Sequence, residues 1–580
     1  MAQIFGSQHI KRKQEDSRDG ISNIPTNKTI YINQFTAKTP TKPNLVKGLK
    51  KLNQIFKYYA PTNEIIIEDY QGAFIKELFS YKELKDFSPE NILKSSNVLL
   101  LLKQQQLECL ELLKAAKKNI DFQEIIQKKT KRNNFIATLK SFKEHLDTNN
   151  EIKFIKKSLN NKNAALNVLL SNDHEWYRII KAQETNRKDS VFLKAIKTKL
   201  RAQHYLWYYL FSDIQDITEF VHKGESYYEE LDLRIKNNLR TILEASKPLE
   251  SAYYALDLFL KNTNTTEVNN LTLLNADIEE CKALDNPIFL NTVKEEFTDN
   301  YDRLDLMEHY SLMVIPGYLG SHTTLEQWAK IASENKVLLI TDFRHLDTPD
   351  DVVELFEKAN HVRADLPMAN TIMTCNWLVA RGANRDLGET EPLYIAPSSA
   401  LAGKLYSSLL SQACAGTQFG TIDAARGVRF LMSKNDLSVI EQKGLIPMYY
   451  ANGSTIAYSA KTLFNGNNLG LQTYSVVRVF DYLSKVLVDY LNQRTFENFN
   501  INVRKQAMEE IIQFLDKHVG TNKLISNFSV LKFERDPKKK DQVILNLNIT
   551  PYFPAKNFLI RMYGKNNALN SDWKTNYEVA

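Results

Sequence analysis

Residues 310–346, YSLMVIPGYLGSHTTLEQWAKIASENKVLLITDFRHL, contain the pattern that predicts the fold of this chain. Two short apolar runs, 312–315 and 337–340, are bounded by turn-forming or polar residues. Apolar runs of this length without alternation are typical of strands covered on both faces, as in a parallel sheet. Between the runs, Thr323 and Thr324 can cap an amphipathic helix. The stretch therefore predicts a strand–helix–strand unit.

The same alternation continues through the C-terminal half and defines an expected α/β core over residues 291–564. We expect helices at 349–359, 399–413, 434–442, 471–496 and 504–519, and strands at 371–379, 393–395, 445–450 and 456–459. The end of the core is predicted to be a β meander of strands 528–534, 542–550 and 557–563, followed by a polar tail at 565–580. The fold class is α/β in this half and α+β for the chain overall.

The N-terminal half is predicted to be mostly helical. Residues 1–27 form a basic arm that we expect to be disordered. Region 28–145 begins with a strand at 29–35, which can pair with its own sheet or with the exposed edge of another chain. It continues with helices at 45–59 and 88–118, the second capped by Ser88. Region 146–290 is expected to be helical, with a kink at Pro248.

Composition favours a protein of the cytoplasm. The 580 residues are 43% hydrophobic and 25% charged, and no apolar run approaches the about 20 residues that a membrane-spanning helix needs. The net charge of +7 permits an acidic partner without requiring nucleic acid. The four cysteines (Cys109, Cys281, Cys375 and Cys414) form no CxxC pair, which argues against a disulfide framework and against a thiolate metal site.

Segment 398–405, SSALAGKL, is the best candidate for a nucleotide site. A phosphate-binding loop needs Gly at its start and Ser or Thr after the Lys, and here Ser398 and Leu405 occupy those positions. Gly403 is better explained as a point where two helices pack closely. An enzyme with a doubly wound nucleotide-binding domain remains the alternative function.

Other polar residues form no catalytic constellation. Asp342 and His345 follow a strand and lack a nucleophile, and three histidines (His174, His204 and His222) are too scattered for a metal site. Three acidic residues (Asp386, Glu389 and Glu391) are interpreted as a solvated loop. Tyrosines at helical spacing suit a core better than an RNA-stacking surface. We expect no cofactor and no metal.

Several segments, taken in order, resemble the large sheath subunit of type VI secretion systems, the TssC family in its Bacteroidetes branch. They are 436–447 (DLSVIEQKGLIP), 456–463 (IAYSAKTL), the helix 471–496 and the strands 543–563. Upstream, 79–90 (FSYKELKDFSPE) resembles part of the small sheath subunit, the TssB family. Either this chain has absorbed part of the role of the small subunit, or the second likeness reflects only a strong helix start.

The resemblance implies a structural protein and not an enzyme. Its core would be similar to phage tail sheath proteins, and its copies would build a contractile sheath, extended around an inner tube, that shortens to propel the tube. The implied partners are further copies of the chain, a small TssB-like subunit, an Hcp-like tube protein, a baseplate and an AAA+ unfoldase that recycles the sheath. Neither nucleic acid nor membrane insertion is implied.

Two sets of site residues follow from this resemblance. Strands shared between subunits are expected at Ile30, Tyr31, Ile32 and Phe35, and at Val543, Leu545, Leu547, Ile549, Phe558 and Ile560. Contact with the inner tube is expected from a charged helix carrying Arg504, Lys505, Glu509, Glu510, Asp516 and Lys517.

Overall fold

The computed structural model describes residues 21, 24–148, 190–283, 287–302, 308–359, 365–539, 541–555, 558–564 and 573–579. Most of the predicted basic arm and His174 lie outside these residues. The chain divides into two compact units. Unit 1 comprises Met1–Tyr59, Ser251–Gly382 and Glu391–Ala580, and unit 2 comprises Ala60–Glu250 and Ala383–Thr390.

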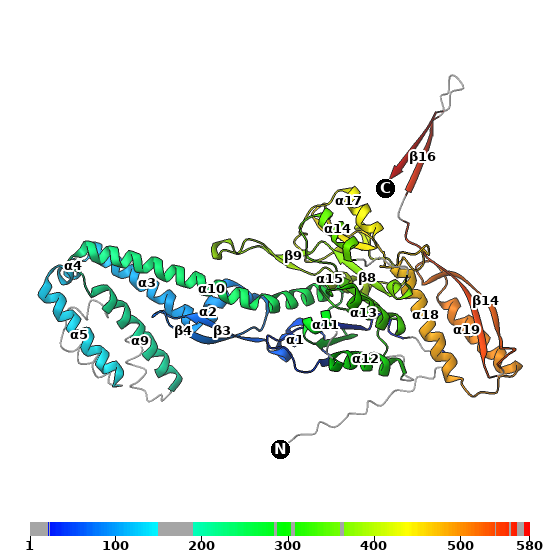
Figure 1. Ribbon diagram of the computed structural model, residues 1–580, viewed down its shortest axis with the longest axis horizontal. Coiled ribbons are helices and arrows are strands. Elements are labelled where there is room, and N and C mark those ends of the chain that lie inside the picture. Colours follow the sequence, from blue (N-terminus) through cyan, green and yellow to red (C-terminus); the bar gives the residue numbers. More distant parts are fainter. Residues whose placement is uncertain are drawn as a thin grey trace, which may run out of the picture. The chain divides into compact units, whose positions relative to one another are not determined.

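A nine-stranded sheet lies at the centre of unit 1 (Figure 1). In spatial order its strands are β11 (Thr421–Ile422), β13 (Ser454–Ala457), β12 (Leu445–Ala451), β8 (Thr371–Cys375), β7 (Leu338–Asp342), β6 (Leu312–Val314), β1 (Thr29–Asn33), β5 (Leu271–Asn275) and β2 (Asn44–Lys47). The six strands from β12 to β5 pair in parallel, each with the next in this order. Towards the two edges of the sheet, β13 is antiparallel to β12, β11 is antiparallel to β13, and β2 is antiparallel to β5. The predicted hairpin of β12 and β13 is confirmed.

The helices of unit 1 connect and cover these strands. They are α1 (Leu52–Tyr59), α11 (Ile278–Ala283), α12 (Pro287–Asp302), α13 (His322–Glu334), α14 (Pro349–Ala359), α15 (Ser398–Ser407), α16 (Gly416–Phe419), α17 (Lys434–Gln442), α18 (Tyr474–Gln493) and α19 (Ile501–Lys517). The unit β6–α13–β7 confirms the prediction from residues 310–346. Its N-cap is Ser321, two residues before the expected Thr323, and Ser321 Oγ accepts from Thr324 N at 3.2 Å.

Strand β1 is an interior strand of this sheet. It pairs in parallel with β5 on one edge and with β6 on the other, and all five of its residues are buried. The prediction that Ile30, Tyr31 and Ile32 pair with a neighbouring subunit is therefore wrong, because both edges of β1 are used within its own chain. Phe35 follows β1 and is buried, and its backbone N–H donates to Asn275 Oδ1 at 2.8 Å. Three consecutive apolar residues at 30–32 fit a strand covered on both faces.

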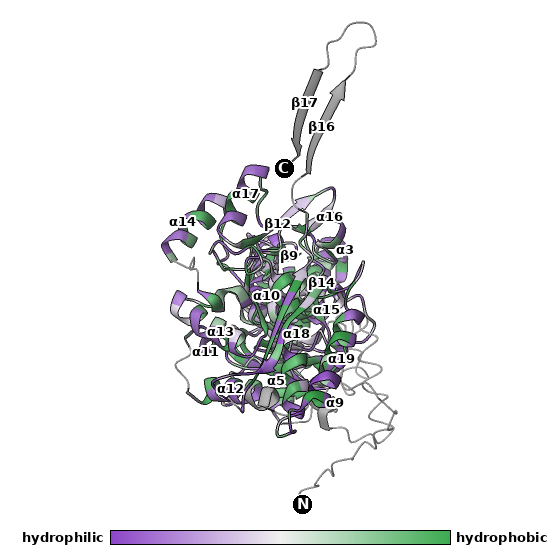
Figure 2. Ribbon diagram, turned by 90° about the vertical axis from the view of Figure 1, so that its right-hand side faces the viewer, coloured by the Kyte–Doolittle hydropathy of each residue, from purple (hydrophilic) through white to green (hydrophobic). Residues whose placement is uncertain are grey.

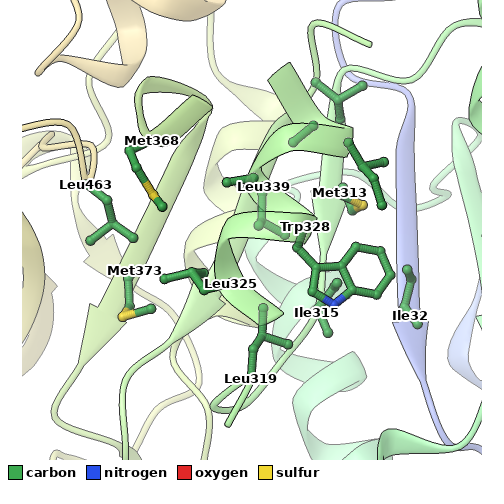
Figure 3. Close-up of a cluster of buried hydrophobic side chains, with 14 of the residues drawn as sticks. Ile32, Met313, Ile315, Leu319, Leu325, Trp328, Leu339, Met368, Met373 and Leu463 are labelled. Carbon is green, nitrogen blue, oxygen red and sulfur yellow. The ribbon is translucent and has the colours of Figure 1, made fainter. Parts of the chain in front are cut away.

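Side chains of β1 enter the core on both sides of the sheet. Ile32 points into a cluster with Met313, Leu339 and Trp328 of α13 (Figure 3). Tyr31 points to the opposite face, where its hydroxyl lies 2.8 Å from Ser399 Oγ of α15. The sheet is thus a middle layer between two layers of helices, the order expected of a mostly parallel sheet.

The outer helices are amphipathic. α14 carries hydrophilic and hydrophobic residues along one ribbon (Figure 2), and its Val352 and Phe356 are buried. Its predicted bounds are confirmed, as are those of α17. Two predictions for the N-terminal half of the chain differ from the structure. Segment 45–59 is strand β2 followed by α1, and β5 lies inside the region that was predicted to be entirely helical.

A second hydrophobic cluster holds the C-terminal part of unit 1 together. It joins α18 and α19 to the antiparallel pair β14 (Ile525–Arg535) and β15 (Val543–Pro551). After β15, β16 (Phe558–Gly564) pairs with β17 (Trp573–Val579). β17 lies in the segment that was predicted to be a polar tail, so that prediction is corrected.

In its described residues, unit 2 consists of helices and one β-hairpin. Its elements are β3 (Thr62–Glu68), β4 (Phe74–Ser80), α2 (Pro89–Ser95), α3 (Asn97–Lys118), α4 (Ile120–Gln127), α5 (Lys129–Asp147), α9 (Ser190–Phe211) and most of α10 (Ile217–Asn262), which continues into unit 1. Ser88 caps α2 as predicted, but the expected single helix is interrupted at Ser96, which caps α3. Pro248 lies inside α10. Among the described residues, no helix combines the length and the apolar character needed to cross a membrane.

Candidate assembly surfaces

Strand β15 combines a partly buried face with an edge that pairs with no other strand of the described residues. Leu545, Leu547 and Ile549 pack against the cluster formed by α18, α19 and β14, whereas Val543 is 37% exposed. In the described part of the chain, β15 pairs with β14 only, so the main-chain N–H and C=O groups of its other edge form no ladder. Such an edge can accept a further strand.

Phe558 and Ile560 lie on β16, where they face Val579 and Tyr577 of β17. The surroundings of these side chains lie outside the described residues. That β15 and β16 are shared between subunits thus stays a prediction. The apolar side chains of β15 pack within the chain, so a neighbouring subunit would pair with the main-chain edge of β15.

Helix α19 separates its residues into an apolar face and a charged face. Ala507, Ile511, Phe514 and Leu515 are buried. On the opposite side, Lys505, Glu509 and Asp516 are exposed at spacings that place them along one stripe.

The other predicted tube-contact residues are engaged inside the chain. Glu510 accepts hydrogen bonds from Tyr490 Oη of α18 at 2.6 Å and from Nη2 of Arg494, the residue that follows α18, at 2.8 Å. These hydrogen bonds contribute to a pKa of Glu510 below its ordinary value. Arg504 pairs with Glu534 of β14 at 3.4 Å, and Lys517 also has a partner within the chain. Only part of the predicted charged set is therefore open for a partner.

The strand ends where a doubly wound enzyme would bind a ligand are closed by Asp342. This residue ends β7 and is fully buried. Its carboxylate accepts from Gly317 N at 2.8 Å, from Ser398 N at 2.8 Å and Ser398 Oγ at 2.5 Å, and from Thr374 Oγ1. Burial raises the pKa of Asp342, and these four donors oppose that rise.

The segment that resembled a phosphate loop has a structural role. The carboxylate of Asp342 occupies the N-terminus of α15, where a phosphate would bind, and Lys404 pairs with Asp423 at 2.6 Å. A Cβ atom on Gly403 would lie 2.3 Å from the carbonyl oxygen of Phe259 in α10. Gly403 therefore allows close packing of α15 on α10, as predicted.

The remaining polar candidates have separate environments. His345 is exposed with its ring against Trp377 and Tyr394, whereas Asp342 is buried. His204 is buried, with Nε2 2.9 Å from the carbonyl oxygen of Leu139, and burial lowers its pKa. Glu391 pairs with Arg429 at 2.8 Å. All four cysteines are buried, and burial raises the pKa of each thiol.

A charged stripe on α18, in which two of three side chains are buried, was not predicted from the sequence. Arg478, Asp481 and Lys485 follow one another at positions i, i+3 and i+7 of a helix assigned mainly from its apolar residues. Charges at this spacing share the face of a helix. Charged residues within an otherwise largely apolar helical segment were the sequence signal that could have indicated buried charges.

In the described residues, the strand ends of the central sheet are closed by Asp342, and one edge of β15 and one stripe of α19 are open to a partner. Two family models match the chain: the type VI secretion system TssC/VipB central domain at residues 241–465, and the TssC/VipB-like C-terminal domain at residues 473–579. These matches span more than half of the chain. The protein belongs to the TssC/VipB family and is a structural subunit of a contractile type VI secretion sheath.

Solved structures of contractile injection systems are also similar to this chain. The contracted helical sheath of the anti-feeding prophage is 15% identical, with a TM-score of 0.39 over 53% of this chain and 80% of that chain. A chain of the anti-feeding prophage baseplate has the same identity and TM-score over 55% and 81%. The contracted PVC sheath complex is 13% identical, with a TM-score of 0.37 over 55% and 81%. TM-scores this low carry no weight in the assignment, which rests on the family models.

No curated protein matches the chain. The family models begin at residue 241, so the resemblance of 79–90 to the small sheath subunit stays a prediction. The alternative of an enzyme has no support in these matches.

Proposed function

We propose that this chain assembles with its copies in the cytoplasm by strand addition along the outer edge of β15. The observation that carries the proposal is a nine-residue strand whose side chains pack against the second hydrophobic cluster and which, among the described residues, has no partner along one main-chain edge. Each main-chain hydrogen bond of an added strand contributes about 1 kcal/mol net. A ladder of such bonds can persist while the surrounding interfaces change packing during contraction.

The donated strands in this proposal are β16 and β17. They pair with each other in the described chain, so they do not complete the central sheet. A small TssB-like subunit is the second source of strands, consistent with the family. The baseplate and a recycling AAA+ unfoldase are further partners that family membership suggests.

Deletion of residues 556–580 tests this proposal. Because β16 and β17 pair with no other strand of the described residues, we expect the shortened chain to fold with an unchanged melting temperature. Co-expressed with the small sheath subunit, it should form no tubes in negative-stain micrographs, whereas the full chain should form them. Tubes of normal appearance from the shortened chain would overturn the assignment of the donated strands.

We further propose that the stripe Lys505, Glu509 and Asp516 contacts the inner tube. These three residues are exposed, and the cluster around α19 fixes the orientation of the helix that carries them. The stripe carries one positive and two negative side chains, which suit a partner surface with complementary charges.

Reversal of the stripe (Lys505→Glu, Glu509→Lys and Asp516→Lys) should abolish co-sedimentation of the Hcp-like tube protein with the sheath. The matched control exchanges the charges of the exposed pair Glu354 and Lys358 on α14, and it should leave co-sedimentation intact. Equal co-sedimentation with both variants would refute a role of this stripe.

A further inference from the structure

A groove in unit 1 lies beside the N-terminal end of α18. Its volume is about 670 Å³, and residues of α16, of β12 and of the segment after β15 line it. Three of its apolar side chains, Phe419, Leu469 and Phe553, are half-exposed. A space of this size can take one large aromatic side chain together with parts of its neighbours.

An aromatic side chain projects from the turn that follows the other end of α18. Phe496 lies between α18 and α19, and its side chain is fully exposed. Its backbone φ is +72°, in the left-handed region that favours glycine and that bulky residues rarely adopt. Since neither burial nor backbone conformation favours Phe at this position, the side chain suits a contact with another molecule.

The turn that carries Phe496 is fixed to the body of unit 1. Arg494 Nη2 donates to Glu510 of α19 at 2.8 Å, and the Arg494 guanidinium pairs with Glu497 at 3.3 Å. The ring of Phe499 lies edge-on to Phe533 of β14, with centroids 5.4 Å apart. Phe496 is thus presented on an ordered base, which reduces the entropy lost when it binds.

The groove and Phe496 are too far apart to meet within one chain. Thr473, the N-cap of α18, lines the groove, whereas Phe496 follows the C-terminal end of the same helix. The 20 residues of α18 span about 30 Å. A contact between the two surfaces therefore needs two copies of the chain. Contacts between two different surfaces of identical copies generate rings or helical filaments.

We propose that Phe496 of one copy inserts into the groove of the next copy, against Phe419, Leu469 and Phe553. A second copy is the occupant because the chain is a sheath subunit and carries both an aromatic side chain and an apolar groove of suitable size. This contact rests on the proposed assembly of copies but not on strand addition, since its residues lie outside 556–580. A chain without 556–580 that still forms tubes would remove strand addition and leave the contact in place.

Cross-linking between copies tests the contact. Glu497→Cys lies next to Phe496 and Gln418→Cys lies on the rim of the groove, both at exposed positions, whereas the four native cysteines are buried. In tubes formed with the small sheath subunit, a chain with both substitutions should give a ladder of multimers with a short bismaleimide. The control, Glu497→Cys with Asp350→Cys at an exposed position of α14, should stay monomeric on the denaturing gel.

Tubes of normal appearance without cross-links from the first pair would overturn the proposal. Cross-linked dimers without larger multimers would also overturn it, because they indicate a closed pair of copies and not a repeated contact.

Substitution of Phe496 separates assembly from folding. Phe496→Gly suits the positive φ, so its melting temperature should not fall. The loss of the aromatic side chain should raise the concentration needed for tube formation by about 30-fold. Phe496→Leu keeps an apolar side chain and is the matched control, with a smaller rise. Tubes from Phe496→Gly at the wild-type concentration would refute the contact.

Discussion

The carboxylate of Asp342 occupies the position that a ligand phosphate takes in doubly wound nucleotide-binding proteins. In such sheets, ligands bind at the carboxyl ends of the strands, beside a helix N-terminus. Here Asp342 closes that position and connects β7, β8 and the start of α15 by its own hydrogen bonds. Asp342, which the sequence offers as a candidate catalytic residue, thus stabilises the fold through its hydrogen bonds.

Asp342→Asn should destabilise unit 1 by about 3 kcal/mol. The amide has one acceptor oxygen for four donors, so buried N–H and O–H groups lose their partner. Asp386→Asn, in an exposed loop, is the control and should change stability by less than about 0.5 kcal/mol. Urea titration measures both. A loss of stability in Asp342→Asn as small as that of the control would show that the hydrogen bonds of Asp342 contribute little to stability.

Lys485 makes stability depend on pH above neutrality. Burial lowers the pKa of Lys485 from 10.5 to about 8. Between these values the unfolded chain binds the proton more tightly than the folded chain, so stability rises with pH. The difference in unfolding free energy between wild type and Lys485→Met should therefore increase by about 3 kcal/mol from pH 8 to pH 10.5. Urea unfolding at both pH values measures it, and a constant difference would contradict the prediction.

At the scale of the element, β1 shows why a strand can be recognised when its pairing cannot. The run 30–32 predicts a strand, and β6, β7, α14 and α17 were likewise predicted from local patterns. The partners of β1 begin about 240 and 280 residues later in the chain. Local periodicity in the sequence does not show which distant strands will pair. A strand preceded by a basic arm was therefore predicted to pair with a neighbouring subunit.

Ile32→Ser distinguishes the two roles of β1. In an interior strand, the loss of a buried side chain and the burial of a hydroxyl should together cost about 4 kcal/mol of unit 1 stability. Val543→Ser, at a position that is 37% exposed on β15, is the matched control and should cost under about 1 kcal/mol. Thermal unfolding of the isolated chain measures both. An unchanged Ile32→Ser chain would restore the donated-strand hypothesis.

At the scale of the whole molecule, unit 2 is formed by two segments, Ala60–Glu250 and Ala383–Thr390, that interrupt the sequence of unit 1. The chain leaves unit 1 after α1 and re-enters it along α10, where the rings of Phe56 and Tyr253 stack with centroids 4.0 Å apart. The family match begins at residue 241 and so leaves most of unit 2 uncovered. The two ends of unit 1 that flank Ala60–Glu250 thus lie side by side.

Replacement of residues 61–249 by a short Gly-Ser linker should leave unit 1 folded. Because each unit has its own hydrophobic core, we expect two transitions in calorimetry of the full chain. The shortened chain should show one of them at nearly the same temperature. A single cooperative transition of the full chain, with an insoluble shortened chain, would contradict this separation.

The sequence by itself determined the class of fold, the positions of most C-terminal elements and the family, because apolar periodicity, helix caps and motif order are local properties of the chain. Only the tertiary structure decided that β1 is an interior strand and that Asp342 accepts hydrogen bonds from the start of α15. The same holds for the hydrogen bond from Tyr490 to Glu510 and for the burial of charged side chains on α18. Each of these depends on contacts between residues far apart in the sequence. Such contacts arise when layers pack and exclude water, and no single segment encodes them.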